Sequence, residues 1–209
     1  MSLDFEQLFE RAQWAGTVLG PGMAPVSRAE IDAVAAELEK PELEADPHLL
    51  LLTLGRALAT RHRELVESFL VSPEDPMLAR AALEVLCDDW DMASQYLTYV
   101  AAFIEGVEWD EEGEVRGMAF SRAGEYLRDQ DNPELLRLLL RAFDDPDEDP
   151  HFRGDAYFAL ARAVGRDWDD LPSAARELDF ERDVDPLVLE AARERLELLL
   201  SGDGSGPAR

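Results

Sequence analysis

Helix start signals recur along this chain and constrain its fold more than any other feature. An Asp or Asn side chain can accept a hydrogen bond from the unpaired N–H groups of a first helical turn, and Pro fits the first helical position because its missing N–H costs nothing there. Ser27 and Glu30 have the spacing of a capping box, which is another start signal. The Asx-Pro pairs are Asp46-Pro47, Asp75-Pro76, Asn132-Pro133, Asp149-Pro150 and Asp185-Pro186.

These signals are periodic. Asp149 follows Asp75 by 74 residues, or two steps of 37, and Asp185 follows after 36 more. The skipped position is Glu112, and the four segments read DPMLARAA, EGEVRGMA, DPHFRGDA and DPLVLEAA. Their fourth residue is apolar and their eighth is a small Ala that would let a neighbouring helix approach closely. These residues are Leu78, Val115, Phe152 and Val188, and Ala82, Ala119, Ala156 and Ala192.

The apolar residues between the signals recur at three- and four-residue spacing, and period-two alternation is nearly absent. A second set of helices is expected near 92–105, 132–143 and 171–179. Two helices per 36–37 residues predict an all-α, right-handed solenoid of about five helix pairs. We expect a single repeat domain over 1–200, with a capping helix near 3–15, a loop over 16–26 and a disordered tail over 201–209.

Two segments resemble HEAT repeats. Residues 147–165, DEDPHFRGDAYFALARAVG, and residues 110–127, DEEGEVRGMAFSRAGEYL, look like the second helix of a HEAT unit. The resemblance covers about 27–200 and implies a ladder in which acidic turn residues hold Arg116 and Arg153. The pattern breaks at Ala79 and Leu189, so the ladder would be incomplete. The resemblance implies a fold and says little about activity.

The charge of the chain narrows its partners. With 46 Asp and Glu against 20 Lys and Arg, the net charge is −26, which disfavours binding to nucleic acid or to an anionic membrane. A basic protein partner is compatible, because opposite charge speeds encounter. The alternative is that the acidity only keeps the chain in solution. No apolar run approaches the roughly 18 residues of a membrane span, and the start of the chain lacks a secretory pattern. Cys87 is the single cysteine, so we expect a reducing, cytoplasmic setting.

Acidic clusters with three tryptophans occupy the expected turns between helices. In a solenoid these turns would lie side by side and form acidic ridges, which we take as the candidate partner-binding surface; solvated turns are the alternative. The tryptophans could anchor a partner or seal the ends of the core. Calcium is a weaker alternative at 144–149, which lacks the glycine and terminal glutamate of a calcium loop. The candidates are Asp88, Asp89, Trp90 and Asp91; Glu108, Trp109, Asp110, Glu111 and Glu112; Asp144, Asp145, Asp147 and Glu148; and Asp167, Trp168, Asp169 and Asp170.

Catalytic and metal-binding signatures are missing from the sequence. His48, His62 and His151 do not have metal-site spacing, and the acidic neighbours of Cys87 would not activate a thiol. We therefore expect no enzyme activity, no cofactor and no metal. The expected function is capture of a basic protein by a chain that is monomeric when free, in its sharpest form an immunity protein that neutralises a bacterial toxin such as a nuclease. The alternatives are a scaffold or assembly factor, or a HEAT-repeat enzyme such as a DNA glycosylase or a bilin lyase.

Overall fold

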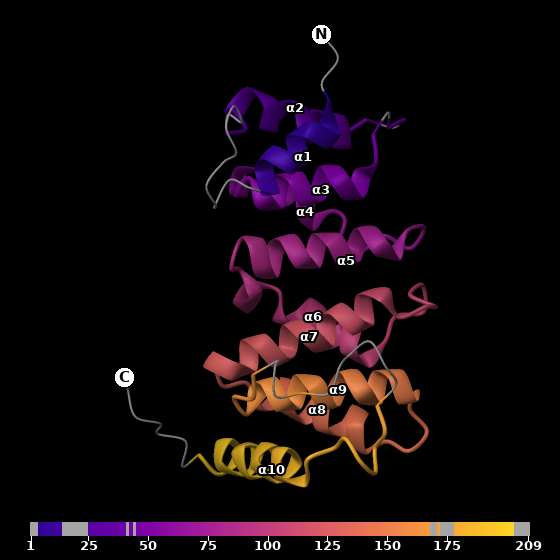
Figure 1. Cartoon of the computed structure of the whole chain (residues 1–209), viewed down its shortest axis with the longest axis vertical. Helices are drawn as coiled ribbons and strands as arrows, with labels where there is room; N and C mark the ends of the chain where they lie inside the picture. The colour runs from indigo at the N-terminus through magenta and orange to yellow at the C-terminus, as the bar shows by residue number, and fades with distance from the viewer. Residues whose placement is uncertain are drawn as a thin grey trace. The chain divides into compact units, whose positions relative to one another are not determined.

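The computed structural model describes residues 4–13, 25–40, 42–43, 45–167, 171 and 178–202. Within them the chain forms ten α-helices and no β-strand, which confirms the all-α prediction (Figure 1). Shorter helical segments are η1 (Thr60–His62) and η3 (Ala93–Gln95), both 3-10, and the π-helical turn η2 (Val85–Asp89). The α-helices are α1 (Phe5–Gln13), α2 (Arg28–Leu38), α3 (Pro47–Arg56), α4 (Arg63–Glu67), α5 (Pro76–Glu84), α6 (Leu97–Glu105), α7 (Glu114–Asp129), α8 (Pro133–Asp144), α9 (Pro150–Ala163) and α10 (Pro186–Ser201).

The helix starts are where the sequence predicts them. Each Asx-Pro pair begins a helix, with the acidic or amide side chain accepting a backbone N–H from the first turn and Pro at its start. The Asp149 carboxylate, for example, accepts from the His151 N–H at 2.8 Å. Ser27 and Glu30 form the complete capping box at α2. Local sequence therefore determines where six of the helices begin: five through their Asx-Pro caps and one, α2, through its capping box.

The start of α7 is capped differently from the periodic pattern. Glu112, the periodic position, is exposed, and the helix begins at Glu114. Asp110 performs the capping: its buried carboxylate accepts the Val115 N–H at 3.0 Å. The helix start thus keeps the periodic spacing, while the side chain that accepts the N–H is Asp110, two residues before the periodic position Glu112.

The chain divides into two compact units. Unit 1 comprises Met1–Tyr96 with Glu108–Val115, and unit 2 comprises Leu97–Val107 with Arg116–Arg209. In unit 1, α3 packs against α1, α2 and α5. The fully buried leucines of this core include Leu50, Leu54 and Leu83. The leucines of α3 and the alanines and Leu83 of α5 therefore contribute to the core of unit 1.

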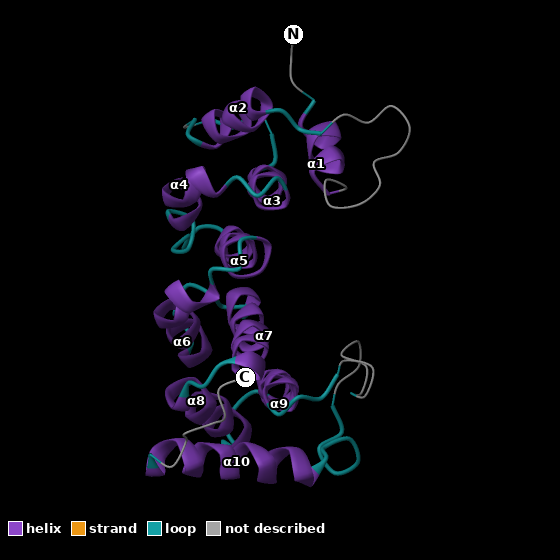
Figure 2. Cartoon of the chain, turned by 90° about the vertical axis from the view of Figure 1, so that its left-hand side faces the viewer, coloured by secondary structure: helices purple, strands orange, loops and turns teal. Residues whose placement is uncertain are grey.

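In unit 2, α8 packs against α6 and α9, and α10 lies across α8 and α9 (Figure 2). Phe120, Leu136 and Tyr157 are fully buried there. Gly124 on α7 lies against the backbone of Ala159 on α9, where a Cβ would come 2.7 Å from the Ala159 Cα. The four alanines at the eighth repeat position, in both units, are fully buried, as expected for residues at helix contacts: Ala82, Ala119, Ala156 and Ala192.

Two further predicted helices are present: η3, in unit 1, and α6, in unit 2, cover the one expected near 92–105, and α8 of unit 2 matches the one near 132–143. A helix is present where the capping helix is expected, near 3–15: it is α1 of unit 1. Residues 172–177 of the helix expected near 171–179 and most of the loop expected over 16–26 lie outside the described residues, as does the expected tail beyond Gly202. None of the described helices has both the length and the apolar character needed to cross a membrane.

Candidate partner-binding surface

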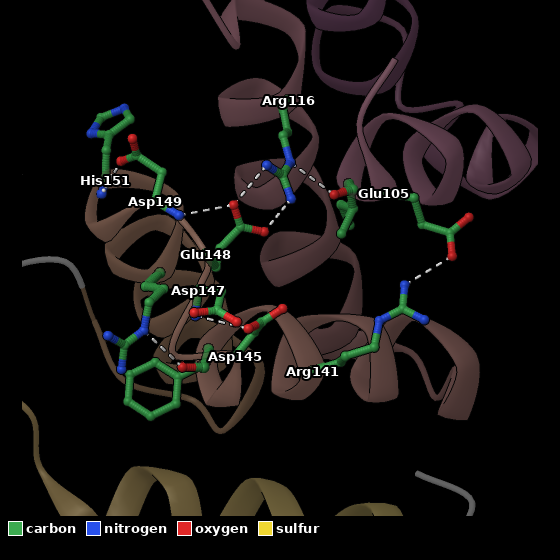
Figure 3. A network of polar contacts seen from close by, with 11 residues as sticks. Glu105, Arg116, Arg141, Asp145, Asp147, Glu148, Asp149 and His151 are labelled. Carbon is green, nitrogen blue, oxygen red and sulfur yellow. Dashed lines mark hydrogen bonds and ion pairs between the residues drawn. The ribbon is translucent and has the colours of Figure 1, made fainter. Parts of the chain in front are cut away.

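The acidic turn of unit 2 joins α8 to α9. The side chains of Asp144, Asp145, Asp147 and Asp149 are exposed, and Glu148 is partly buried. The turn is shaped by its own carboxylates (Figure 3): Asp145 accepts the Asp147 N–H at 2.9 Å, and Glu148 accepts the Asp149 N–H at 3.1 Å. The exposed carboxylates therefore project from a turn with a defined backbone. We call Asp144, Asp145, Asp147, Glu148 and Asp149 the acidic turn.

Arg116 fixes this turn to the rest of unit 2. Its Nη1 and Nη2 donate to the two carboxylate oxygens of Glu148 at 3.0 and 2.5 Å, and its Nε donates to the Ile104 carbonyl at 2.9 Å (Figure 3). The guanidinium also lies over the Phe152 ring, 4.5 Å from its centroid. Arg116 thus joins the end of α6, the start of α7 and the acidic turn, with the geometry of a bidentate arginine–carboxylate pair.

Arg153 occupies the equivalent position one repeat later. Its Nε donates to the Phe143 carbonyl at 3.1 Å, which matches the carbonyl contact of Arg116. Its guanidinium lies over the Phe180 ring at 4.3 Å from the centroid. Arg116 and Arg153 therefore share one local role. Arg116 ties the start of α7 to the end of α6, and Arg153 ties the start of α9 to the end of α8.

Where the pattern breaks at Ala79, the next residue supplies a cation. In unit 1, Arg80 Nη1 lies 3.1 Å from a Glu114 carboxylate oxygen. Both side chains are substantially exposed, so this ion pair stabilises little. The pair shows only that Arg80, one position after the break, has an acidic partner in the same unit.

The arginines of unit 2 are largely committed to carboxylates of the same unit. Arg162 is buried and pairs bidentately with Glu125 at 2.9 and 3.1 Å, while Arg141 pairs with Glu105 at 2.9 Å. Among the described residues no Lys or Arg forms an ion pair with Asp145, and the same holds for Asp147 and Asp149. Because the cations are used inside the fold, the charge left on the turn is negative.

The cluster at 88–91, in unit 1, is divided between surface and core. Asp88 and Asp91 are exposed, whereas the side chain of Asp89 is 6 % exposed and pairs with Arg56 at 2.6 Å. Burial raises the pKa of Asp89, and the nearby Arg56 opposes that rise. Trp90 is buried, which favours the interpretation that it seals the core.

The cluster at 108–112 is also in unit 1 and precedes α7. Glu108, Glu111 and Glu112 are exposed, and Asp110 is the buried cap of α7. Trp109 is partly exposed. Of the tryptophans within the described residues, Trp109 is therefore the one whose ring a partner could reach without opening the core.

The last cluster falls mostly outside the described residues, which include Asp167 but not Trp168, Asp169 or Asp170. Asp167 is exposed and lies 3.4 Å from Arg162. The histidines pair separately with aspartates: His48 with Asp75, His62 with Asp32 and His151 with Asp155. In the described parts of the chain, no three His, Cys, Asp or Glu side chains form a group that could hold a metal ion.

The pair of Arg162 and Glu125 was not recognised in the sequence, although a signal for it exists. The two residues are 37 apart, which is the repeat length, and so occupy the same position in α7 and α9. Opposite charges separated by one repeat length are therefore a sequence signal for such a pair.

Comparisons with protein-family models, with curated proteins and with solved structures give no match to this chain.

Proposed function

We propose that this chain is a HEAT-like, right-handed helical solenoid that binds a basic protein partner and has no catalytic role. The 36–37-residue period, the capped helix starts and the buried alanines at equivalent positions support the repeat architecture. Repeat architectures of this kind present extended surfaces for binding other macromolecules.

The observation that carries the binding proposal is the acidic turn. Its four aspartates are exposed, Arg116 holds the side chain of its Glu148, and within the described residues no Lys or Arg pairs with Asp145, Asp147 or Asp149. A rigid array of like charges attracts a basic surface and loses little conformational freedom when that surface docks. Trp109, in unit 1, is a separate candidate that would supply apolar contact area to a partner.

In its most specific form the proposal is an immunity protein that neutralises a basic bacterial toxin, such as a nuclease, in the cytoplasm. Strong acidity fits such a target, and a single buried cysteine fits a reducing compartment. The net charge of −26 opposes self-association, so we propose a monomer when free. A scaffold or assembly factor for a basic protein is the less specific form of the same proposal.

The test uses the partner captured from the native host by the tagged chain, with association measured at several salt concentrations. Asp145→Asn, Asp147→Asn and Asp149→Asn together should slow association about tenfold at low salt and flatten its salt dependence. The charge-matched control combines Glu6→Gln, Glu10→Gln and Glu64→Gln, all exposed in unit 1, and should change the rate less than about twofold.

Truncation of the tryptophan tests the anchor separately. Trp109→Ala should speed dissociation and leave the association rate nearly unchanged, because an apolar anchor acts after encounter. Association that is insensitive to salt and to both triple variants would show that the acidity serves only solubility.

A further inference from the structure

The last helix of unit 2 exposes two leucines on one flank, about 110° around the helix axis from its buried residues. Helix α10 packs on α8 and α9 and buries Val188 and Ala192 (Figure 2). Leu187 and Leu198 are 61 % and 57 % exposed. An outermost helix of a repeat array usually carries a polar outer face, so exposed leucines there require an explanation.

Leu187 and Leu198 share one stripe of α10. They are 11 residues apart, which is about three helical turns. Their side chains therefore project in directions only about 20° apart, and the two residues are separated by about 16 Å along the helix axis. Glu190 and Glu194 lie between them in the sequence and border the stripe on one side, and both are exposed. We call Leu187, Glu190, Glu194 and Leu198 the α10 stripe.

The charge next to this stripe is negative and uncompensated. The two cations of α10 are engaged with the body of unit 2: Arg193 pairs with Asp144 at 2.7 Å, and Arg195 pairs with Asp131 at 2.7 Å. Arg195 also donates to the carbonyls of Ala163 and Gln130. Within the described residues neither Glu190 nor Glu194 forms an ion pair with Lys or Arg. The stripe therefore combines two apolar anchors with two carboxylates.

We propose that the α10 stripe binds a basic amphipathic helix of a protein partner, with two apolar side chains about 16 Å apart and Lys or Arg beside them. An amphipathic helix supplies apolar residues at that separation, and its cations would face Glu190 and Glu194. This proposal takes the basic character of the partner from the proposed function and assigns a different surface to it. A second copy of this chain fits less well, because its own carboxylates would oppose those of the stripe.

The probe is a fluorescein-labelled, 18-residue helical peptide of Leu and Lys with its leucines on one face, titrated with the whole chain and followed by anisotropy. Leu187→Ser with Leu198→Ser should raise Kd at least about tenfold, because two apolar contacts are lost. Leu200→Ser is the matched control, since Leu200 is 64 % exposed on the same helix but projects about 150° away from Leu187 and Leu198. It should change Kd less than about twofold.

A peptide of the same composition with its leucines scrambled around the helix should bind at least about tenfold more weakly to the wild-type chain. Equal binding of both peptides, or equal losses for Leu200→Ser and the double variant, would mean non-specific attraction and would refute the proposal. If the peptide loses affinity only when Asp145, Asp147 and Asp149 are neutralised, and not in the leucine double variant, the α10 stripe is not its binding site. The proposed function would remain in that case. Sedimentation showing a dimer that Leu198→Ser disrupts would assign the stripe to a second copy instead.

Discussion

Gly124→Ala tests the packing of unit 2 most directly, because two physical effects act on it with opposite sign. Replacing Gly by Ala inside a helix normally stabilises it by about 1 kcal/mol. A Cβ at Gly124, however, would lie 2.7 Å from the Ala159 Cα and 2.8 Å from its carbonyl oxygen. Carbon atoms in contact prefer about 3.5–4 Å. Since both obstructing atoms belong to the backbone, no rotamer change relieves the contact, and α7 and α9 would have to separate by about 1 Å.

Overpacking of this kind costs about 1–3 kcal/mol. The upper part of that range, about 2–3 kcal/mol, applies here because the obstructing backbone atoms cannot move aside. The gain in helix propensity offsets about 1 kcal/mol of this cost. We therefore expect Gly124→Ala to lower the free energy of unfolding by about 1–2 kcal/mol. Gly154→Ala on α9 is the control in the same unit. Its Cβ would meet only the Leu178 Cβ, at 3.7 Å, an ordinary contact. Only the propensity effect remains, so Gly154→Ala should stabilise the unit by up to about 1 kcal/mol.

Urea denaturation followed by circular dichroism measures both variants, and melting temperatures should move by about 2–4 °C per kcal/mol for a chain of this size. The two variants should move in opposite directions. If Gly124→Ala is as stable as Gly154→Ala, the close approach of α7 to α9 is wrong.

Three further predictions concern single side chains. Arg116→Ala should destabilise unit 2 by about 2–4 kcal/mol, because Glu148 loses its bidentate partner, and Arg116→Lys should recover only part of this; urea melts measure both. Burial raises the pKa of Asp155, so its contribution to stability is fully present below the ordinary aspartate pKa of about 4 and is lost as pH rises through the raised value. Asp155→Asn should therefore raise the melting temperature more at pH 7 than at pH 3.5, and an equal rise at both would contradict the assignment. Leu58 has a φ of +51°, which glycine adopts more easily than leucine, so Leu58→Gly should stabilise unit 1 by about 1 kcal/mol. Gly165 has a φ of +84°, so Gly165→Leu should destabilise unit 2. If thermal melts show the melting temperature changing in the same direction for both variants, this reasoning is wrong.

The sequence alone determined where most helices begin. A cap at Asp75, Asn132 or Asp149 needs only its own side chain, a backbone N–H two or three residues later and a Pro, all within one turn of chain. The all-α class followed from the same local rules and from the apolar spacing. The positions of the buried alanines followed from the period, because equivalent residues of successive repeats occupy equivalent environments.

The acidic turn could be located from the sequence, but the availability of each side chain could not. Asp89 and Asp110 have the same composition around them as the exposed aspartates, yet both are buried, one beside Arg56 and one as a helix cap. Trp90 and Trp109 look alike beside their acidic neighbours, and only the first is buried. Burial depends on which distant segments pack against a residue, and no window of neighbouring residues contains that information.

Tertiary structure also decided the partners of the arginines. Arg116 takes its acceptors from residues 12 positions earlier and 32 positions later, and Arg162 takes Glu125 from 37 positions earlier. Tertiary structure also decided which helix glycine is needed for close packing. Gly124 and Gly154 look alike in the sequence, and they differ in the atoms that a Cβ would meet. Caps are settled within one turn of helix, whereas ion pairs and close approaches are settled by how whole helices stack, because the atoms that meet come from different helices.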